Sequence, residues 1–218
     1  MVVGNFLFIN TEISSTSSIH FKLIPMPKNH SPRKKQFLDE SLKMIHEKGY
    51  QATTMRDLAE RMGFEVSNIY NFIDSKETLL ETYLFQISED FHSGIDHILE
   101  SSHNSTGKLK ALISLNIQLT ATKPYQVGLL VNEWRNLKEP KLKKFTDRRS
   151  EYEEKVRLII SEGIESGEFR TFDLDIITHA VLSSVRWIYY WYTDHTEEAN
   201  PIELEKQLTE FILGGVVR

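Results

Sequence analysis

The sequence predicts an all-α protein, and three observations lead to this fold class. Apolar residues recur at helical spacing in short stretches over residues 32–75, with glycines between them. From Ser75 onward, helical patterns follow one another almost without interruption, each bounded by a capping residue, a proline or a glycine. No convincing strand pattern and no internal repeat is found in the sequence. We expect nine helices, over residues 37–48, 55–62, 66–72, 75–100, 108–122, 124–138, 140–166, 173–192 and 201–214.

Local signals define the first four helices. Gly49 ends the first helix, as a glycine at a helix C-terminus commonly does. Thr54 offers an N-cap hydroxyl to the second helix, and Asp57 completes a weak capping box. Gly63 ends that helix, and a tight turn leads into the third. An aspartate or a serine at residues 74–75 then caps the long fourth helix.

Prolines and polar stretches bound the helices that follow. The polar loop Ser101–Gly107 separates the fourth helix from the fifth. Pro124, Pro140 and Pro201 each open a helix, because proline suits the first helical position. Asp173 caps the eighth helix.

The first helices have the layout of a DNA-reading motif. Two short helices joined by a turn of three or four residues that contains glycine form a helix-turn-helix. An ordinary small helical bundle shares the pattern of helix, glycine and helix, so this pattern alone leaves both interpretations open.

The stretch from Pro32 to Leu80 also resembles the N-terminal domain of the tetracycline-repressor (TetR) family. The matching positions are Gly49–Tyr50, Thr53–Thr54, Leu58–Ala59, Gly63, Ile69–Tyr70, Ser75–Glu77 and Leu79. The sequence departs from the family pattern at Val66, Ser67 and Ile73. The resemblance implies a DNA-binding domain followed by a helical ligand-binding and dimerisation domain.

Carried over position by position, the resemblance implies a set of DNA-binding residues. Val66, Ser67, Asn68 and Asn71 are expected to face the major groove, where an asparagine can bond an adenine edge with two hydrogen bonds. Arg56 is expected to reach a base or a phosphate. Thr54, Tyr70 and Lys76 are expected to hold phosphates without reading sequence.

The helix over residues 173–192 is apolar on much of its circumference, which predicts that it is buried on several sides. In TetR relatives, the corresponding helix and the last helix pair with their twofold mates, so the resemblance implies a homodimer. The residues expected at the dimer interface are Ala180, Ser184, Ile188, Leu204, Leu208, Phe211 and Ile212. The other interpretation is that these residues only fill the core of one protomer.

The segment from Glu162 to Tyr192 resembles TetR members that respond to acyl-CoA or fatty-acid ligands. In those members an aromatic motif on the eighth helix lies beside the ligand tunnel. From residue type, we expect a ligand pocket lined by Trp134, Arg186, Trp187, Tyr190 and Trp191. Their aromatic rings could enclose an apolar ligand, and the arginine could pair with an anionic group. The other interpretation is that the aromatic residues are plain core.

Composition excludes several kinds of site. The chain has no cysteine, so it has no disulfide and no cysteine-based zinc site, and we expect neither a metal nor another cofactor. Its scattered histidines and carboxylates show no catalytic motif, so we do not expect an enzyme. No apolar run is long enough to span a membrane, which favours the cytoplasm.

Three segments are expected along the chain. Residues 1–31 look like a flexible extension, in which translation could instead begin at Met26. Residues 32–78 form the helix-turn-helix domain, and over residues 28–76 nine lysines and arginines stand against seven acidic residues, a small basic excess that suits binding to DNA. Residues 79–218 form the ligand-binding and dimerisation domain, which is acidic.

The sequence therefore predicts an all-α transcriptional regulator, a ligand-released repressor that binds a palindromic DNA operator as a homodimer. The expected effector is hydrophobic, such as a fatty acid or an acyl-CoA. The alternative is a helical ligand-binding or scaffold protein that has lost operator binding, which the unusual Val66 and Ser67 would favour.

Overall fold

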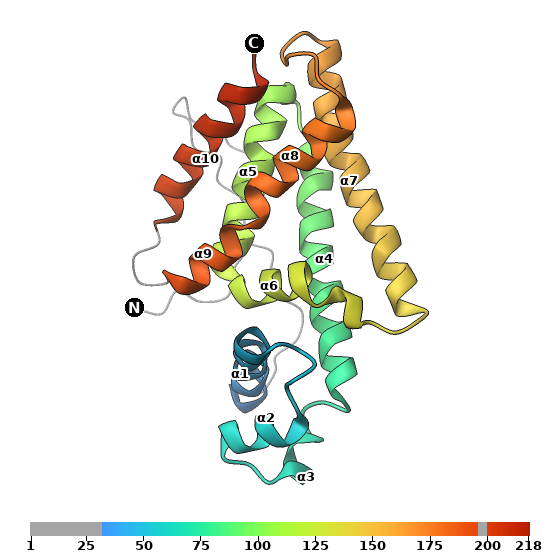
Figure 1. The fold of residues 1–218 in the computed structure, drawn as a ribbon, viewed down its shortest axis with the longest axis vertical. Helices are drawn as coiled ribbons and strands as arrows, with labels where there is room; N and C mark the ends of the chain where they lie inside the picture. Colours follow the sequence, from blue (N-terminus) through green and yellow to red (C-terminus); the bar gives the residue numbers. More distant parts are fainter. Residues whose placement is uncertain (1–31, 196–199) are drawn as a thin grey trace. The chain divides into compact units, whose positions relative to one another are not determined.

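The computed structural model describes residues 32–195 and 200–218, and it confirms the all-α class (Figure 1). Within these residues, β pairing is limited to an isolated bridge between Phe169 and Val217. The elements are α1 Pro32–Lys48, α2 Met55–Met62, α3 Val66–Ile69, α4 Lys76–Glu100, α5 Ser105–Thr122, α6 Pro124–Asn132, the 3-10 helix η1 Trp134–Asn136, α7 Lys141–Glu165, α8 Leu174–Arg186, α9 Ile188–Asp194 and α10 Pro201–Val216.

All nine expected segments contain helix, but five of them differ in detail. The first helix begins at Pro32, and the fifth begins at Ser105, inside the loop expected over Ser101–Gly107, because Asn104 caps it. The segment over residues 173–192 is divided at Trp187 into α8 and α9. The third helix is a single turn that ends at Ile69, and turn structure follows it. The sixth ends at Asn132 and continues as η1.

The chain forms two compact units, residues 1–36 and residues 37–218. The expected extension over residues 1–31 lies outside the described residues. Of the first unit, the structure describes only residues 32–36, where Arg33, Lys34 and Lys35 belong to α1 and not to an extended arm.

Helices α1, α2 and α3 share a small apolar core. Phe37 and Met44 from α1 pack against Leu58 and Ala59 from α2, and Ile69 from α3 is fully buried among them. Phe72 stacks between Phe37 and Phe64, with ring centroids 5.5 and 5.7 Å apart. This cluster fixes α3 against α1 and α2.

Arg61 holds α2 against α1 from the outside. Its guanidinium bonds both carboxylate oxygens of Glu47, at 2.6 and 2.9 Å, and one oxygen of Glu40 at 3.1 Å. The bond to Arg61 lowers the pKa of the Glu47 carboxyl below its usual range. A two-pronged contact of this kind sets the angle between the helices as well as their distance.

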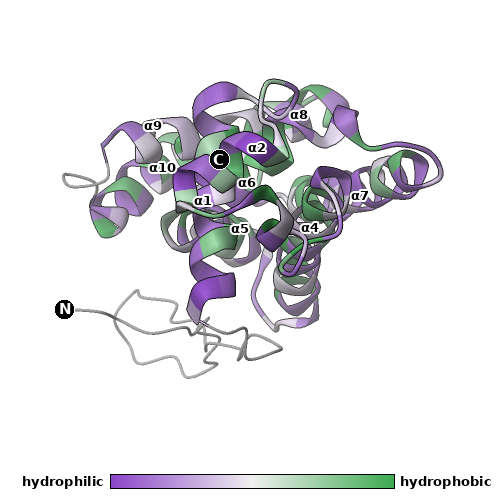
Figure 2. Ribbon diagram, turned by 90° about the horizontal axis from the view of Figure 1, so that it is seen from below, coloured by the Kyte–Doolittle hydropathy of each residue, from purple (hydrophilic) through white to green (hydrophobic). Residues whose placement is uncertain are grey.

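The longer helices form the body of the unit. α4 continues from the short helices and contacts α5, α6 and α7, while α10 and α8 both pack on α5 (Figure 1). Figure 2 shows hydrophilic and hydrophobic residues side by side along these helices, as expected when a helix buries one side and exposes the other.

A second apolar cluster joins α1 to α4 and α6. Leu42 and Ile45 of α1 pack with Leu80 and Leu84 of α4, and Leu129 of α6 belongs to the same cluster. The start of α4 therefore shares one core with α1 and with α6. Because such a core is closely packed, a displacement of α6 is transmitted to α1 through it.

Candidate functional site

The expected base-reading residues form an exposed surface on and after α3. Val66, Ser67, Asn68, Tyr70 and Asn71 are all exposed. In the same turn Ile69 points inward and is fully buried. The surface therefore combines the polar side chains of Ser67, Asn68 and Asn71 with the exposed Val66 and Tyr70, and the buried Ile69 anchors it from beneath.

The start of α2 supplies two more of the expected residues. The Thr54 hydroxyl accepts a hydrogen bond from the Asp57 backbone N–H at 3.1 Å, and the Asp57 carboxylate accepts from the Thr54 backbone N–H at 2.8 Å. The capping box read from the sequence is thus present. Arg56 is exposed in the first turn of that helix.

Lys76 differs from its expected role. Its ammonium group donates to the carbonyl oxygens of Tyr50 at 2.9 Å and Thr53 at 2.8 Å, with Gln51 at 3.5 Å. It also lies 4.3 Å from the centroid of the Tyr50 ring. The ammonium is therefore directed at the loop before α2, where it can position that loop.

The same loop is held from the body side by η1. The Tyr50 backbone N–H donates to the Glu133 carboxylate at 3.2 Å, and the Gln51 amide donates to Asn136. Asn136 in turn donates to Glu133 at 2.7 Å. The loop that carries the N-cap of α2 is thus connected to the end of α6.

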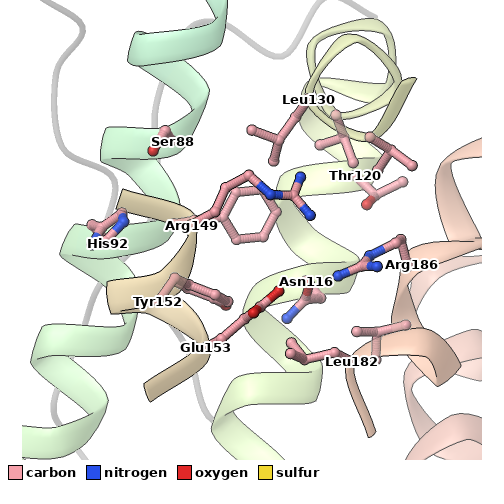
Figure 3. A pocket seen from close by; sticks show the side chains of 14 residues that line it. Ser88, His92, Asn116, Thr120, Leu130, Arg149, Tyr152, Glu153, Leu182 and Arg186 are labelled. Atoms are coloured by element: carbon pink, nitrogen blue, oxygen red, sulfur yellow. The ribbon is translucent and has the colours of Figure 1, made fainter. Parts of the chain in front are cut away.

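A cavity of about 100 Å³ lies inside the body (Figure 3). Side chains from α4, α5, α6, α7 and α8 line it, which places it among the packed helices. Its lining residues are Ser88, Phe91, His92, Asn116, Thr120, Val127, Leu130, Val131, Arg149, Tyr152, Glu153, Leu182, Val185 and Arg186.

Of the five expected pocket residues, Arg186 lines this cavity and the other four lie outside its lining. Trp187 and Tyr190 point to the exterior, with 44% and 62% of their surface exposed. Trp191 stacks on His195. Trp134 stacks on Phe145 and lies outside the cavity.

The actual lining residues gave no distinct signal in the sequence. Six of the fourteen are apolar residues at ordinary core spacing, eight carry scattered polar or charged groups, and together they come from five separate helices. Trp134 is nevertheless one contact away, because the Arg149 guanidinium carbon lies 4.7 Å from the centroid of its ring.

The expected dimer interface is also corrected in part. Ile188, Leu208 and Ile212 are buried within the protomer and are withdrawn from the interface. Ala180 and Phe211 are exposed, while Ser184 and Leu204 are partly exposed. Apolar residues that the interface set omitted are exposed nearby on the same helices, at Ile176, Trp187 and Ile202.

None of the described helices is long and apolar enough to cross a membrane. Within residues 32–195 and 200–218, no group of His, Asp or Glu side chains is arranged to hold a metal ion.

Known proteins match both parts of the chain. A family model described as bacterial regulatory proteins of the tetR family matches residues 37–83. A second, described as the tetracyclin repressor-like C-terminal domain, matches residues 102–216.

Several characterised proteins are similar over most of their length. The transcriptional repressor KstR2 of Mycolicibacterium smegmatis is 24% identical over 198 residues, which cover 88% of this chain and 94% of the relative. The fatty acid metabolism regulator protein of Bacillus subtilis is 20% identical over 190 residues, covering 87% and 98%.

Solved structures share the fold. The ketosteroid transcriptional regulator KstR2 of Mycobacterium tuberculosis has a TM-score of 0.80 at 22% identity, covering 87% of this chain and 97% of that one. AibR in complex with isovaleryl coenzyme A and operator DNA has a TM-score of 0.69 at 20% identity, covering 82% and 97%.

Proposed function

Because the chain belongs to the tetracycline-repressor (TetR) family of bacterial regulatory proteins, we propose that it is a cytoplasmic repressor which binds a palindromic operator as a homodimer. A small molecule in the body cavity releases it from DNA. The observation that carries this proposal is the exposed, polar surface of α3 above a fully buried Ile69.

The reading surface divides into two roles. Val66, Ser67, Asn68 and Asn71 contact base edges, because they are exposed on one short, anchored turn. Arg56, Thr54 and Tyr70 contact phosphates or sugars and set the register. Lys76 supports this surface from behind and does not read or hold DNA itself.

The dimer forms through the outer faces of α8 and α10. Ile176, Ala180 and Trp187 make one exposed stripe on α8 and its end, and Phe211 adds an exposed apolar side chain on α10. Large exposed apolar side chains on neighbouring helices are typical of surfaces that bind another protein. A twofold pairing of this face places two reading surfaces on one operator.

The domain division follows from these roles. Residues 32–78 read DNA, and residues 79–218 bind the effector and the second protomer. The names of the relatives, a ketosteroid regulator, a fatty acid metabolism regulator and an isovaleryl coenzyme A complex, support a hydrophobic or acyl-CoA-like effector.

The contacts also suggest how the effector acts. The cavity of about 100 Å³ is smaller than the roughly 300–1,000 Å³ of most small-molecule sites, so a larger ligand separates the lining helices as it enters. Val127 and Val131 bring α6 to the cavity, and α6 leads directly into η1. Through Glu133 and Asn136, η1 holds the loop before α2.

The effector therefore acts by linkage. A ligand that favours a different spacing of the two reading surfaces weakens operator binding by its difference in affinity for the two states.

Salt-dependent duplex binding tests the proposal. A duplex enriched from random sequence should bind with an affinity that falls steeply with salt, by a slope of about −0.9 in log–log form per phosphate contact. Asn68→Ala should relax the preference at one base position in each half-site, at a cost of about 1–3 kcal/mol. Ser150→Ala, which changes an exposed serine on α7, is the control and should leave the preference intact.

The alternative function, a helical ligand-binding or scaffold protein, predicts a different outcome. It requires that no sequence is enriched and that the weak residual binding is the same for wild type and Asn68→Ala.

A further inference from the structure

Two arginines meet at the cavity from opposite sides. Arg149 projects from α7 and Arg186 from the last turn of α8, and Figure 3 shows both guanidinium groups turned toward the cavity centre. Neither forms an ion pair within 4 Å among the described residues, whereas eleven such pairs occur elsewhere in that part of the chain. Burial, and then the charge of Arg186, lower the pKa of Arg149, which indicates a positive group that lacks compensation.

One carboxylate, that of Glu153, stands against these two charges in the cavity lining. Glu153 favours the charged form of Arg149, but it leaves a net positive charge at this end of the cavity. The polar groups at the other end are already occupied. His92 Nε2 is 3.0 Å from the Arg148 carbonyl oxygen, and Ser88 accepts from the Arg148 side chain at 3.2 Å.

The hydroxyl of Tyr152 is the other unsatisfied group. It is buried, and among the described residues it is the buried side-chain polar atom without a hydrogen-bond partner. Asn116, its neighbour in the lining, opposes the rise that burial causes in the pKa of Tyr152. Its amide donates to the Leu112 carbonyl at 2.8 Å and makes no hydrogen bond of normal geometry with the Tyr152 hydroxyl. A buried hydroxyl without a partner costs free energy, so its retention in a cavity wall indicates a partner that arrives with a ligand.

Apart from Thr120, the rest of the lining is apolar. Phe91, Val127, Leu130, Leu182 and Val185 surround the polar groups and present only carbon to the cavity. Arg186 is exposed and still lines the cavity, so the cavity reaches the surface beside α8. The site therefore combines an entrance with positive charge, one buried hydroxyl donor and an apolar wall.

We propose that this cavity binds a compact oxyanion, a carboxylate or a phosphate, that is attached to an apolar chain. Arg149 and Arg186 hold the oxyanion from two sides, the Tyr152 hydroxyl donates a further hydrogen bond, and the chain lies against the apolar wall. The inference rests on the proposed function, because it names the chemical class of the effector for the same cavity.

The test uses three probes with the same chain, octanoate, octyl phosphate and the uncharged octanol, titrated by calorimetry into the full-length protein. At least one of the two anions should bind about tenfold or more tightly than octanol, since each charge-assisted hydrogen bond is worth about that factor. Octanoate and octyl phosphate distinguish a carboxylate from a phosphate. Octanol binding as tightly as both anions, or no binding by either anion, would overturn the proposal.

Variants locate the bound group. Arg186→Gln should weaken anion binding about tenfold and leave octanol unchanged. Tyr152→Phe should also weaken anion binding, yet leave the melting temperature of the empty protein equal or higher, because the hydroxyl has no partner to lose. Tyr192→Phe, at a half-buried tyrosine outside the cavity lining, is the matched control and should change neither quantity.

Duplex binding by the same preparation separates the two claims. Operator binding without anion binding would overturn the anion site and leave the repressor function standing. Anion binding without any duplex preference would overturn the repressor function and keep the site. Anion binding that survives unchanged in Arg186→Gln and Tyr152→Phe would place the ligand elsewhere.

Discussion

At the scale of single residues, Lys76 supports the reading surface through the loop that precedes α2. Three backbone carbonyls and the Tyr50 ring surround its ammonium, so its charge is used within the protein. The family pattern places a lysine here and suggests a phosphate contact, but the pattern carries no information on which way the side chain turns.

We therefore expect Lys76→Met to destabilise the protein by about 1.5–3 kcal/mol, the range for a hydrogen bond to a charged group. Thermal unfolding measures this loss, and Lys110→Met, at an exposed lysine on α5, is the control. The slope of operator affinity against salt should stay the same for both. If the magnitude of this salt slope decreases by about 1 for Lys76→Met and stability is unchanged, Lys76 contacts a phosphate instead.

Glu205 on α10 gives a second prediction, on pH. Burial raises the pKa of its carboxyl above the ordinary value near 4.5, and the Ser114 hydroxyl on α5 opposes this rise. A raised pKa in the folded state means that the carboxyl stabilises the protein at acid pH and that this contribution is lost as pH rises through the folded-state pKa.

Glu205→Gln should therefore raise the melting temperature at about pH 8, where the buried charge is removed, and give little gain at about pH 4. Glu210→Gln, at an exposed glutamate of the same helix, should give a similar small effect at both values. An equal gain for Glu205→Gln at both pH values would contradict the assigned cause.

At the scale of helices, most boundaries could be predicted because they depend on local chemistry. The capping box at Thr54, the left-handed glycine at Gly63 and the N-cap at Asp173 are all present. The break at Trp187 could not be predicted, because no proline or glycine marks it. The shortness of α3 was also missed, since its apolar residues pack equally well in a turn.

The helix faces were harder to predict than the helices. Ile212 and Phe211 are neighbours on α10, and both suit an apolar interface by residue type. Ile212 is 4% exposed and packs inside the protomer, whereas Phe211 is 72% exposed. Which side of α10 meets α5 depends on packing between distant segments, and a single-helix pattern does not contain that information.

This pair of neighbours tests the dimer. Phe211→Glu should give a folded monomer, with helix content near wild type, because Phe211 contributes little to the protomer core. Ile212→Glu should prevent folding, since burying an unpaired carboxylate costs several kcal/mol. Light scattering and circular dichroism measure both. A folded, intact dimer for Phe211→Glu would remove the α8 and α10 face from the interface.

At the scale of the whole molecule, the family could be predicted from residues 32–80 and the all-α fold from helical patterns along the chain, but the cavity could not. Its lining comes from α4, α5, α6, α7 and α8, and each contributes residues that look like ordinary core. We instead expected the pocket at aromatic residues that lie at the end of α8 and on α9. Residue type alone does not tell whether an aromatic side chain faces the interior or the solvent.

The proposed mechanism connects three parts of the molecule. They are an exposed reading turn, a cavity with unpaired positive charge, and the hydrogen bonds at the end of α6 and in η1 that lie between the two. Two of these linking bonds, from Tyr50 to Glu133 and from Gln51 to Asn136, join the loop before α2 to the end of α6. A ligand that moves α6 changes the position of α2 through them.

The most direct test of the central claim is an anisotropy titration of a selected, twofold-symmetric duplex with wild type and with folded Phe211→Glu. The account predicts that wild type binds as one dimer per duplex with an affinity that falls steeply with salt, and that the monomeric variant loses most of this affinity. Equal affinity of the two proteins, or no preference of wild type for any duplex, would contradict it.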